Sequence, residues 1–114
     1  MISNQRFSEM ALAFSEAIEV PHFEKRSFRV NKKIFATLDE SAERACVPFS
    51  EIDQSAFTSF DKSVIYPVPN KWGKQGWTFI ELKKVEEETL LDALTTAYRK
   101  VAPKRLGDLY ICEP

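Results

Sequence analysis

Apolar side chains recur along the chain with two different periods, and the periods predict helices near both ends with strands between them. Over residues 3–20 they return every three to four positions, as they do on the buried side of an amphipathic helix. Ser3 is suited to the N-cap, and Pro21 ends this helix because the residue before a proline avoids helical geometry. The same spacing over residues 86–102 predicts a last helix that stops at Pro103.

The middle of the chain follows the period of two that is typical of β-strands. Residues 27–30 and 33–38 alternate in this way, and Asn31-Lys32 between them suits a two-residue turn because asparagine tolerates a positive φ. One parity of this hairpin is assigned to the core, namely Phe28, Val30, Ile34, Ala36 and Leu38. Further strands are expected at residues 45–49, 64–68 and 77–82.

A short helix is expected between the third and fourth strands. Ser50 followed by Asp53 resembles a helix start, and an apolar stripe follows, made of Ile52, Ala56, Phe57 and Phe60. The resulting order of helix, strands, short helix, strands and helix lacks the βαβ alternation of parallel sheets. We therefore predict an α+β fold, a twisted antiparallel sheet with the N- and C-terminal helices packed on it.

The composition indicates one ordinary soluble domain. A chain of 114 residues that is 44% hydrophobic and 29% charged can bury one core. We assign this domain to residues 1–106 and treat residues 107–114 as a C-terminal tail. The N-terminus is polar and no apolar run approaches the ~20 residues of a bilayer span, so we expect a cytoplasmic monomer that does not contact a membrane.

The residue types that carry catalysis or bind metals are scarce. The single histidine, His22, is expected in an exposed loop, far from a nucleophile. Cys46 and Cys112 have no metal-ligand spacing and are expected to be free, reduced thiols. Gly73 and Gly76 do not form a phosphate-binding loop. We therefore expect no enzyme activity, no metal and no cofactor. The weakest alternative is an enzyme, which would need a buried carboxylate or histidine with a shifted pKa in a cleft.

Basic residues gather in three parts of the chain, although the net charge is −1. The groups are Lys25, Arg26, Arg29, Lys32 and Lys33; then Lys71, Lys74, Lys83 and Lys84; then Arg99, Lys100, Lys104 and Arg105. A fold that brought them to one surface would give a neutral protein a local positive field for nucleic acid. The residues that we predict for such a site are Arg29, Lys32, Lys33, Lys71, Trp72, Lys74, Arg99, Lys104 and Arg105.

Several aromatic residues lie at the strand parity opposite to the expected core. Phe35, Trp77 and Phe79 on an uncovered sheet face could stack on bases beside the cations, as in proteins that bind single strands. Alternatively, a helix covers that face and the three residues are ordinary core. Trp72, in the expected loop over residues 69–76, either fastens this loop to the sheet or is an exposed recognition residue.

Three segments resemble the MmcQ/YjbR family of small bacterial proteins, and the resemblance covers nearly the whole chain up to Leu106. They are the hairpin over residues 28–36, the Tyr66-Pro67-Val68-Pro69 stretch followed by Trp72-Gly73-Lys74-Gln75-Gly76-Trp77, and the basic end of the last helix over residues 98–106. The family usually has leucine-proline-glycine after its first helix, where this chain has residues 14–19. A lysine often found in the third strand is Pro48 here, which weakens the expectation of a basic surface at that strand.

The resemblance implies a frataxin-like (CyaY-like) α+β fold and DNA binding, without established catalytic residues or a cofactor. Together with the charge groups, it favours a nucleic-acid-binding protein that uses the basic hairpin and the tryptophan loop. The alternative is a domain that binds a protein or a small ligand through its aromatic sheet face, without catalysis.

Overall fold

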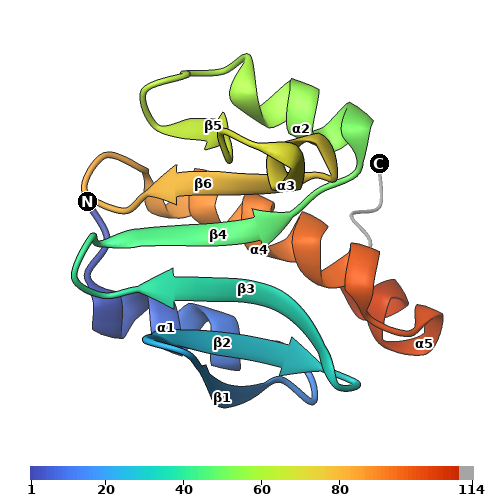
Figure 1. Cartoon of the computed structure of the whole chain (residues 1–114). Helices are drawn as coiled ribbons and strands as arrows, with labels where there is room; N and C mark the ends of the chain where they lie inside the picture. The colour runs from blue at the N-terminus through green and yellow to red at the C-terminus, as the bar shows by residue number, and fades with distance from the viewer. Residues whose placement is uncertain (111–114) are drawn as a thin grey trace.

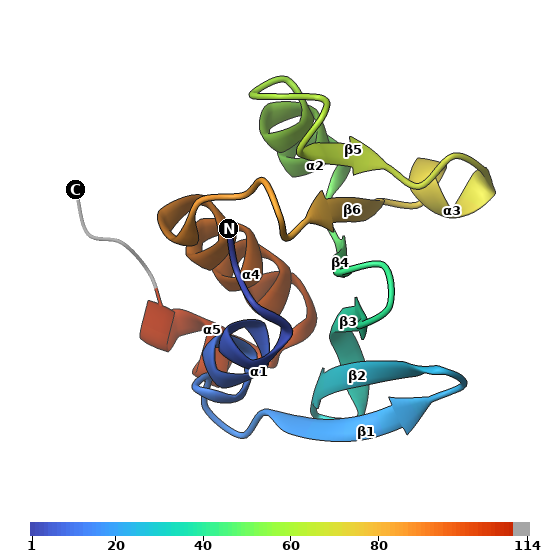
Figure 2. The same cartoon turned by 90° about the vertical axis from the view of Figure 1, so that its left-hand side faces the viewer.

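A curved antiparallel sheet divides the molecule into a helical side and an open side (Figures 1 and 2). The computed structural model describes residues 1–110. Its elements, in chain order, are α1 (Asn4–Leu12), β1 (Ile18–His22), β2 (Lys25–Val30), β3 (Lys33–Asp39), β4 (Arg44–Pro48), α2 (Glu51–Thr58), β5 (Ile65–Pro67), α3 (Lys71–Lys74), β6 (Trp77–Glu81), α4 (Glu87–Val101), α5 (Lys104–Gly107) and a 3₁₀ turn, η1 (Asp108–Tyr110).

The six strands are ordered β1-β2-β3-β4-β6-β5, and every neighbouring pair is antiparallel. Helices α1, α4 and α5 cover one face of this sheet, whereas only the short α3 lies toward the other face (Figure 2). The predicted α+β fold with an antiparallel sheet and terminal helices is confirmed. Each helix within the described residues is too short or too polar to cross a bilayer.

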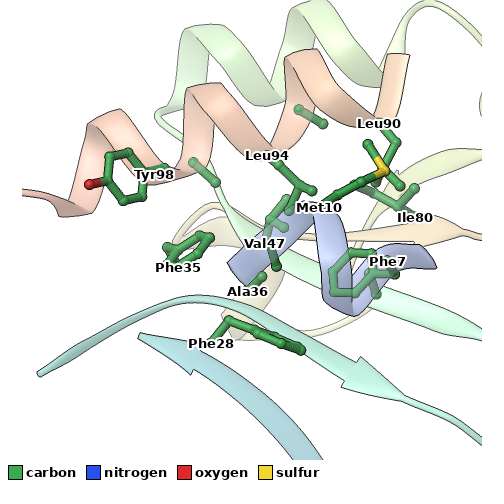
Figure 3. Close-up of a cluster of buried hydrophobic side chains, with 14 of the residues drawn as sticks. Phe7, Met10, Phe28, Phe35, Ala36, Val47, Ile80, Leu90, Leu94 and Tyr98 are labelled. Carbon is green, nitrogen blue, oxygen red and sulfur yellow. The ribbon is translucent and has the colours of Figure 1, made fainter. Parts of the chain in front are cut away.

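The hydrophobic core lies between the sheet and helices α1 and α4 (Figure 3). The aromatic rings meet there edge to face, with 5.6 Å between the ring centroids of Phe7 and Phe28 and 5.3 Å between those of Phe35 and Tyr98. All four side chains are fully buried. Such pairs add to the free energy gained from burying apolar surface, so these rings help to fix α1 and α4 on the sheet.

The first helix is shorter than its apolar spacing predicts, and an unpredicted strand follows it. The helix ends at Leu12, and β1 pairs along its length with β2, with Val20 opposite Ser27. Ile18, which had been assigned to the buried side of a helix, is 55% exposed on this edge strand. The prediction of one helix up to Pro21 was therefore wrong. Residues 18–22 make their backbone hydrogen bonds with β2 instead of within a longer helix, and the spacing of apolar residues does not reveal a partner elsewhere in the chain.

The hairpin of β2 and β3 has the predicted turn but an unpredicted bulge. Asn31 and Lys32 both have positive φ, 51° and 69°, as a two-residue hairpin turn requires. Further along, Phe28 is opposite Ala36 while Arg29 is opposite Ile34, so Phe35 is an extra residue on β3. The bulge turns Phe35 into the core and Ile34 toward the open side. The predicted sides of these two residues were therefore wrong.

Candidate functional site

The open face of the sheet carries a row of cross-strand neighbours that no helix covers. The pairing register places Ser27 opposite Thr37, Thr37 opposite Cys46, and Cys46 opposite Phe79. Side chains of paired residues point to the same face, so this row forms the floor of the open side. Tyr66 extends it on β5, where its ring lies edge to face with Phe79 at 5.6 Å.

A hollow of about 330 Å³ lies over this floor. Its aromatic wall is formed by Trp72, Trp77 and Phe79, and its other lining residues are His22, Lys25, Ile34, Thr37, Cys46 and Val68. The curvature of the sheet accounts for this combination, because it turns the β1–β2 hairpin and α3 toward each other across the open side (Figure 2). Trp77 and Phe79 are half-buried, so the aromatic rings remain accessible from this side.

Trp72 lies in the short helix α3 within the segment that had been predicted to be a loop. Asn70 caps this helix by accepting a hydrogen bond from the Trp72 backbone nitrogen at 2.8 Å. Gln54 Nε2 of α2 donates to the Gly73 carbonyl at 2.8 Å and to Thr78 Oγ1 at 3.1 Å, which ties α3 to the body of the protein. The Trp72 side chain is 50% exposed and lines the hollow, so it presents a ring to solvent at a fixed position.

The two ends of the open side differ in charge. The end where β2 and β4 finish carries five cations in two separate places: Arg29, Lys32 and Lys33 at the β2–β3 turn, and Lys71 and Lys74 in α3, on the other side of β4 (Figure 1). We call this the basic end. Lys33 is opposite the core residue Val30, so its side chain leaves the sheet on the helical face. Only part of the first two predicted basic groups reaches this end: Lys25 and Arg26 lie at the start of β2, and Lys83 and Lys84 follow the end of β6, both at the opposite end of the sheet.

The opposite end carries charges of both signs in register. Lys25 of β2 is near Asp39 of β3. In the strand register, Arg44 of β4 is opposite Asp39 on one side and opposite Glu81 of β6 on the other. The Arg44 guanidinium lies 4.0 Å from the centre of the Phe79 ring, and Tyr66 Oη donates a hydrogen bond to Glu81. Because the signs alternate, this end offers little net field to an anion.

The third basic group lies on the helical side. Arg99 belongs to α4, and Lys104 and Arg105 belong to α5, and both helices lie on the helical side of the sheet (Figure 2). Lys104 pairs with Asp108 at 3.2 Å and Arg105 pairs with Glu16 at 3.0 Å, where the hydrogen bonds from Arg105 lower the pKa of Glu16. The fold thus separates these three residues from the basic end and neutralises two of them.

His22 is the last residue of β1, rather than part of an exposed loop as predicted, and it is half-buried at the rim of the hollow. Arg44, Ile34 and Lys25 also belong to the hollow or its border, and the predicted site had left them out. Arg44 shares the strand parity of Cys46, so the alternation along β4 places both side chains on the open face. The predicted strand began at residue 45, however, and so did not include Arg44. Within residues 1–110, no three His, Cys, Asp or Glu side chains are close enough to bind one metal ion.

Burial makes the Cys46 thiol a poor nucleophile. It raises the pKa of Cys46 from 9.0 to about 11, against the weaker lowering effect of Lys25. The thiolate is the reactive species, and at neutral pH this raised pKa lowers the thiolate fraction of Cys46 by about 100-fold. Cys46 is a free thiol as predicted, and Cys112 lies outside the described residues.

We expect native Cys46 to react with a thiol reagent at pH 8 at least about 100-fold more slowly than in urea-unfolded protein, because both the thiolate fraction and access are reduced. The measurement is the rate of reaction with Ellman's reagent in a Cys112→Ser variant, which leaves one cysteine. A native rate close to the unfolded rate would contradict the buried position of this thiol.

Comparison with known proteins gives one family and one similar fold. The YjbR family model matches residues 12–100, which include every residue that lines the hollow. The crystal structure of Deinococcus radiodurans protein DR2400, which contains the DUF419 domain, is similar with a TM-score of 0.76 and 17% identity, covering 88% of this chain and 78% of that one. At that identity the similarity shows the fold alone. No curated protein matches the chain.

Proposed function

The chain belongs to the YjbR family, and from the geometry of its open side we propose that it binds single-stranded nucleic acid without catalysing a reaction on it. One observation carries this proposal: the accessible rings of Trp72 and Trp77 line one hollow, and Lys71 Nζ lies 5.7 Å from the centre of the Trp72 ring. Proteins that bind single strands combine the same two features, since aromatic rings stack on bases while nearby cations contact the phosphates.

The aromatic hollow favours a single strand over a duplex. Bases of a duplex are stacked on one another, so a duplex could use only the cations of the basic end. Unpaired bases can instead enter the hollow and stack on Trp77 or Trp72, which adds ~1–3 kcal/mol per base. Binding without chemistry fits this site because the thiol on its floor, Cys46, has a raised pKa and stays protonated at neutral pH.

We expect Trp77→Ala to weaken binding of a short single-stranded oligonucleotide by about 10-fold or more, because one stacked base is lost. The measurement is fluorescence anisotropy with labelled DNA and RNA at low salt. Lys71→Gln should weaken binding less and should reduce the slope of log K against log salt by about 0.7, the value for one phosphate contact to a single strand.

Lys104→Gln is the matched control, because Lys104 is a lysine on the helical side that already pairs with Asp108. It should leave both the affinity and the salt slope unchanged. The proposal is overturned if the wild-type protein binds neither DNA nor RNA at low salt, or if Lys104→Gln and Lys71→Gln have equal effects.

The hollow also favours a second candidate, a small neutral aromatic or apolar ligand. Its wall is formed by Trp72, Trp77, Phe79 and Val68, and its volume of about 330 Å³ is in the range of small-molecule sites. Such a ligand would lose affinity in Trp77→Ala but would bind equally well to Lys71→Gln at every salt concentration. Salt dependence therefore separates the two candidates.

A further inference from the structure

Helix α2 has an apolar side that the rest of the molecule leaves uncovered. Its inner side is half-buried, since Phe57 stacks on the buried Phe49 with 4.7 Å between ring centroids. Ile52, Ala56 and Phe60 recur every four residues on a different side, and Ile52 is 81% and Phe60 83% exposed. The sequence had placed these apolar residues in one stripe, but in the structure only Phe57 among them is half-buried, and the other three are exposed.

Two grooves flank the exposed Phe60 ring. One, of about 300 Å³, lies between α2 and the first turns of α4, with Ala56, Phe57 and Thr89 along it. The other, of about 260 Å³, is lined by Val64 and Ile65 and runs toward the start of α4. An exposed apolar residue with a groove on each side is typical of a protein-binding site.

The borders of these grooves are acidic. They carry four carboxylates, Asp61, Glu86, Glu88 and Asp92, and one ammonium group, Lys84. None of the ion pairs within residues 1–110 uses any of the four carboxylates. A partner that covers the apolar Phe60 ring is therefore surrounded by carboxylates that form no ion pair within the described residues.

We propose that this acidic groove surface, formed by α2 and the start of α4, binds a basic amphipathic helix of a partner protein. The apolar side chains of the partner would cover Phe60 and Ile52, and its lysines or arginines would pair with Glu88 and Asp92. This site goes beyond the proposed function, because α2 lies on the helical side of the sheet and the aromatic hollow opens on the other side (Figure 2).

Charge argues against a second copy of this chain as the occupant. A symmetric dimer brings the same patch of both subunits together. Glu88 and Asp92 of one copy would then face the same carboxylates of the other, and like charges across an interface disfavour association. A partner with the opposite charge gains from the same groups.

The test uses the full chain and a 14-residue amphipathic peptide of leucine and lysine, with a leucine–glutamate peptide of the same pattern as the charge control. Binding is measured by anisotropy of the labelled peptides at low salt. We expect the lysine peptide to bind at least 10-fold more tightly than the glutamate peptide. Phe60→Ser should weaken it by about 10-fold, and Glu88→Lys combined with Asp92→Lys should weaken it by a similar factor.

Phe23→Ser is the matched control, because Phe23 is 94% exposed at the distant β1–β2 turn. It should leave peptide binding unchanged, and circular dichroism verifies that each variant is folded. The proposal is overturned if both peptides bind equally, or if Phe60→Ser and Phe23→Ser bind like the wild type. It is also overturned if sedimentation shows a wild-type dimer that Phe60→Ser converts to a monomer, because a second copy then covers the surface.

Discussion

Gly76→Ala is expected to lower the free energy of unfolding by at least ~3 kcal/mol. The measurement is urea denaturation, in which the midpoint should shift to a lower urea concentration. Gly76 has a φ of +107°, which side chains rarely adopt, and an added Cβ would lie 2.0 Å from the Phe49 carbonyl oxygen. The backbone cannot move away easily. The Gly76 carbonyl accepts hydrogen bonds from the Phe49 nitrogen and from Thr78 Oγ1, both at 2.9 Å.

The matched control for this variant is Gly107→Ala. A Cβ at Gly107, the last residue of α5, would be 3.7 Å from the nearest atoms of Arg99 in α4, which is ordinary van der Waals contact. We expect a change within ~1 kcal/mol, in the stabilising direction if any, because alanine favours helices. Equal urea midpoints for Gly76→Ala and the wild type would show that the chain between α3 and β6 does not need glycine.

Phe35→Ala is expected to lower the free energy of unfolding by ~3–5 kcal/mol, because it leaves a cavity in the core. Phe35 is fully buried, and its ring packs edge to face on Tyr98 and Phe14, at 5.3 and 5.9 Å between centroids. The measurement is urea denaturation followed by circular dichroism. If this variant does not fold, Phe35→Leu should fold with a smaller loss of ~1.5 kcal/mol.

Phe79→Ala is the comparison, because it removes the same ring from the open face. Phe79 is half-buried and its main partner is the Arg44 guanidinium, so we expect a loss of ~1–2 kcal/mol. This variant should also weaken binding in the hollow, whereas Phe35→Leu should not. Equal losses of stability at the two positions would mean that the β3 bulge does not turn Phe35 into the core.

The antiparallel sheet and the last helix could be predicted because local patterns specify them directly. The turn at Asn31 and Lys32 depends on two residues that take positive φ, and α4 depends on a long apolar stripe whose members Leu90 and Leu94 are fully buried. Neither feature needs knowledge of a distant partner. For this reason the predicted boundaries of these elements are close to those of the structure.

The candidate site was predicted only in part. Trp77 and Phe79 lie on an open face, as one of the two alternatives held, and the hairpin cations reach the same end as Lys71 and Lys74. Lys104 and Arg105 are on the other side of the sheet, because α5 lies on the helical side (Figure 2). The number of charges in a stretch of sequence does not reveal whether they lie on the open side or the helical side, because it does not indicate on which face of the sheet an element packs.

The sequence by itself determined the fold class, the family resemblance and the parity of most strand residues, because each follows from the spacing of apolar residues and from motifs formed by neighbouring residues. Only the tertiary structure decided that β1 is a strand, that a bulge reverses Ile34 and Phe35, and that α2 leaves Phe60 exposed. The physical reason is that each outcome depends on contacts between residues distant in the chain. For β1 and the bulge, the free energy of such pairing exceeds the weak local preference, whereas Phe60 stays exposed because no distant element within residues 1–110 packs over it.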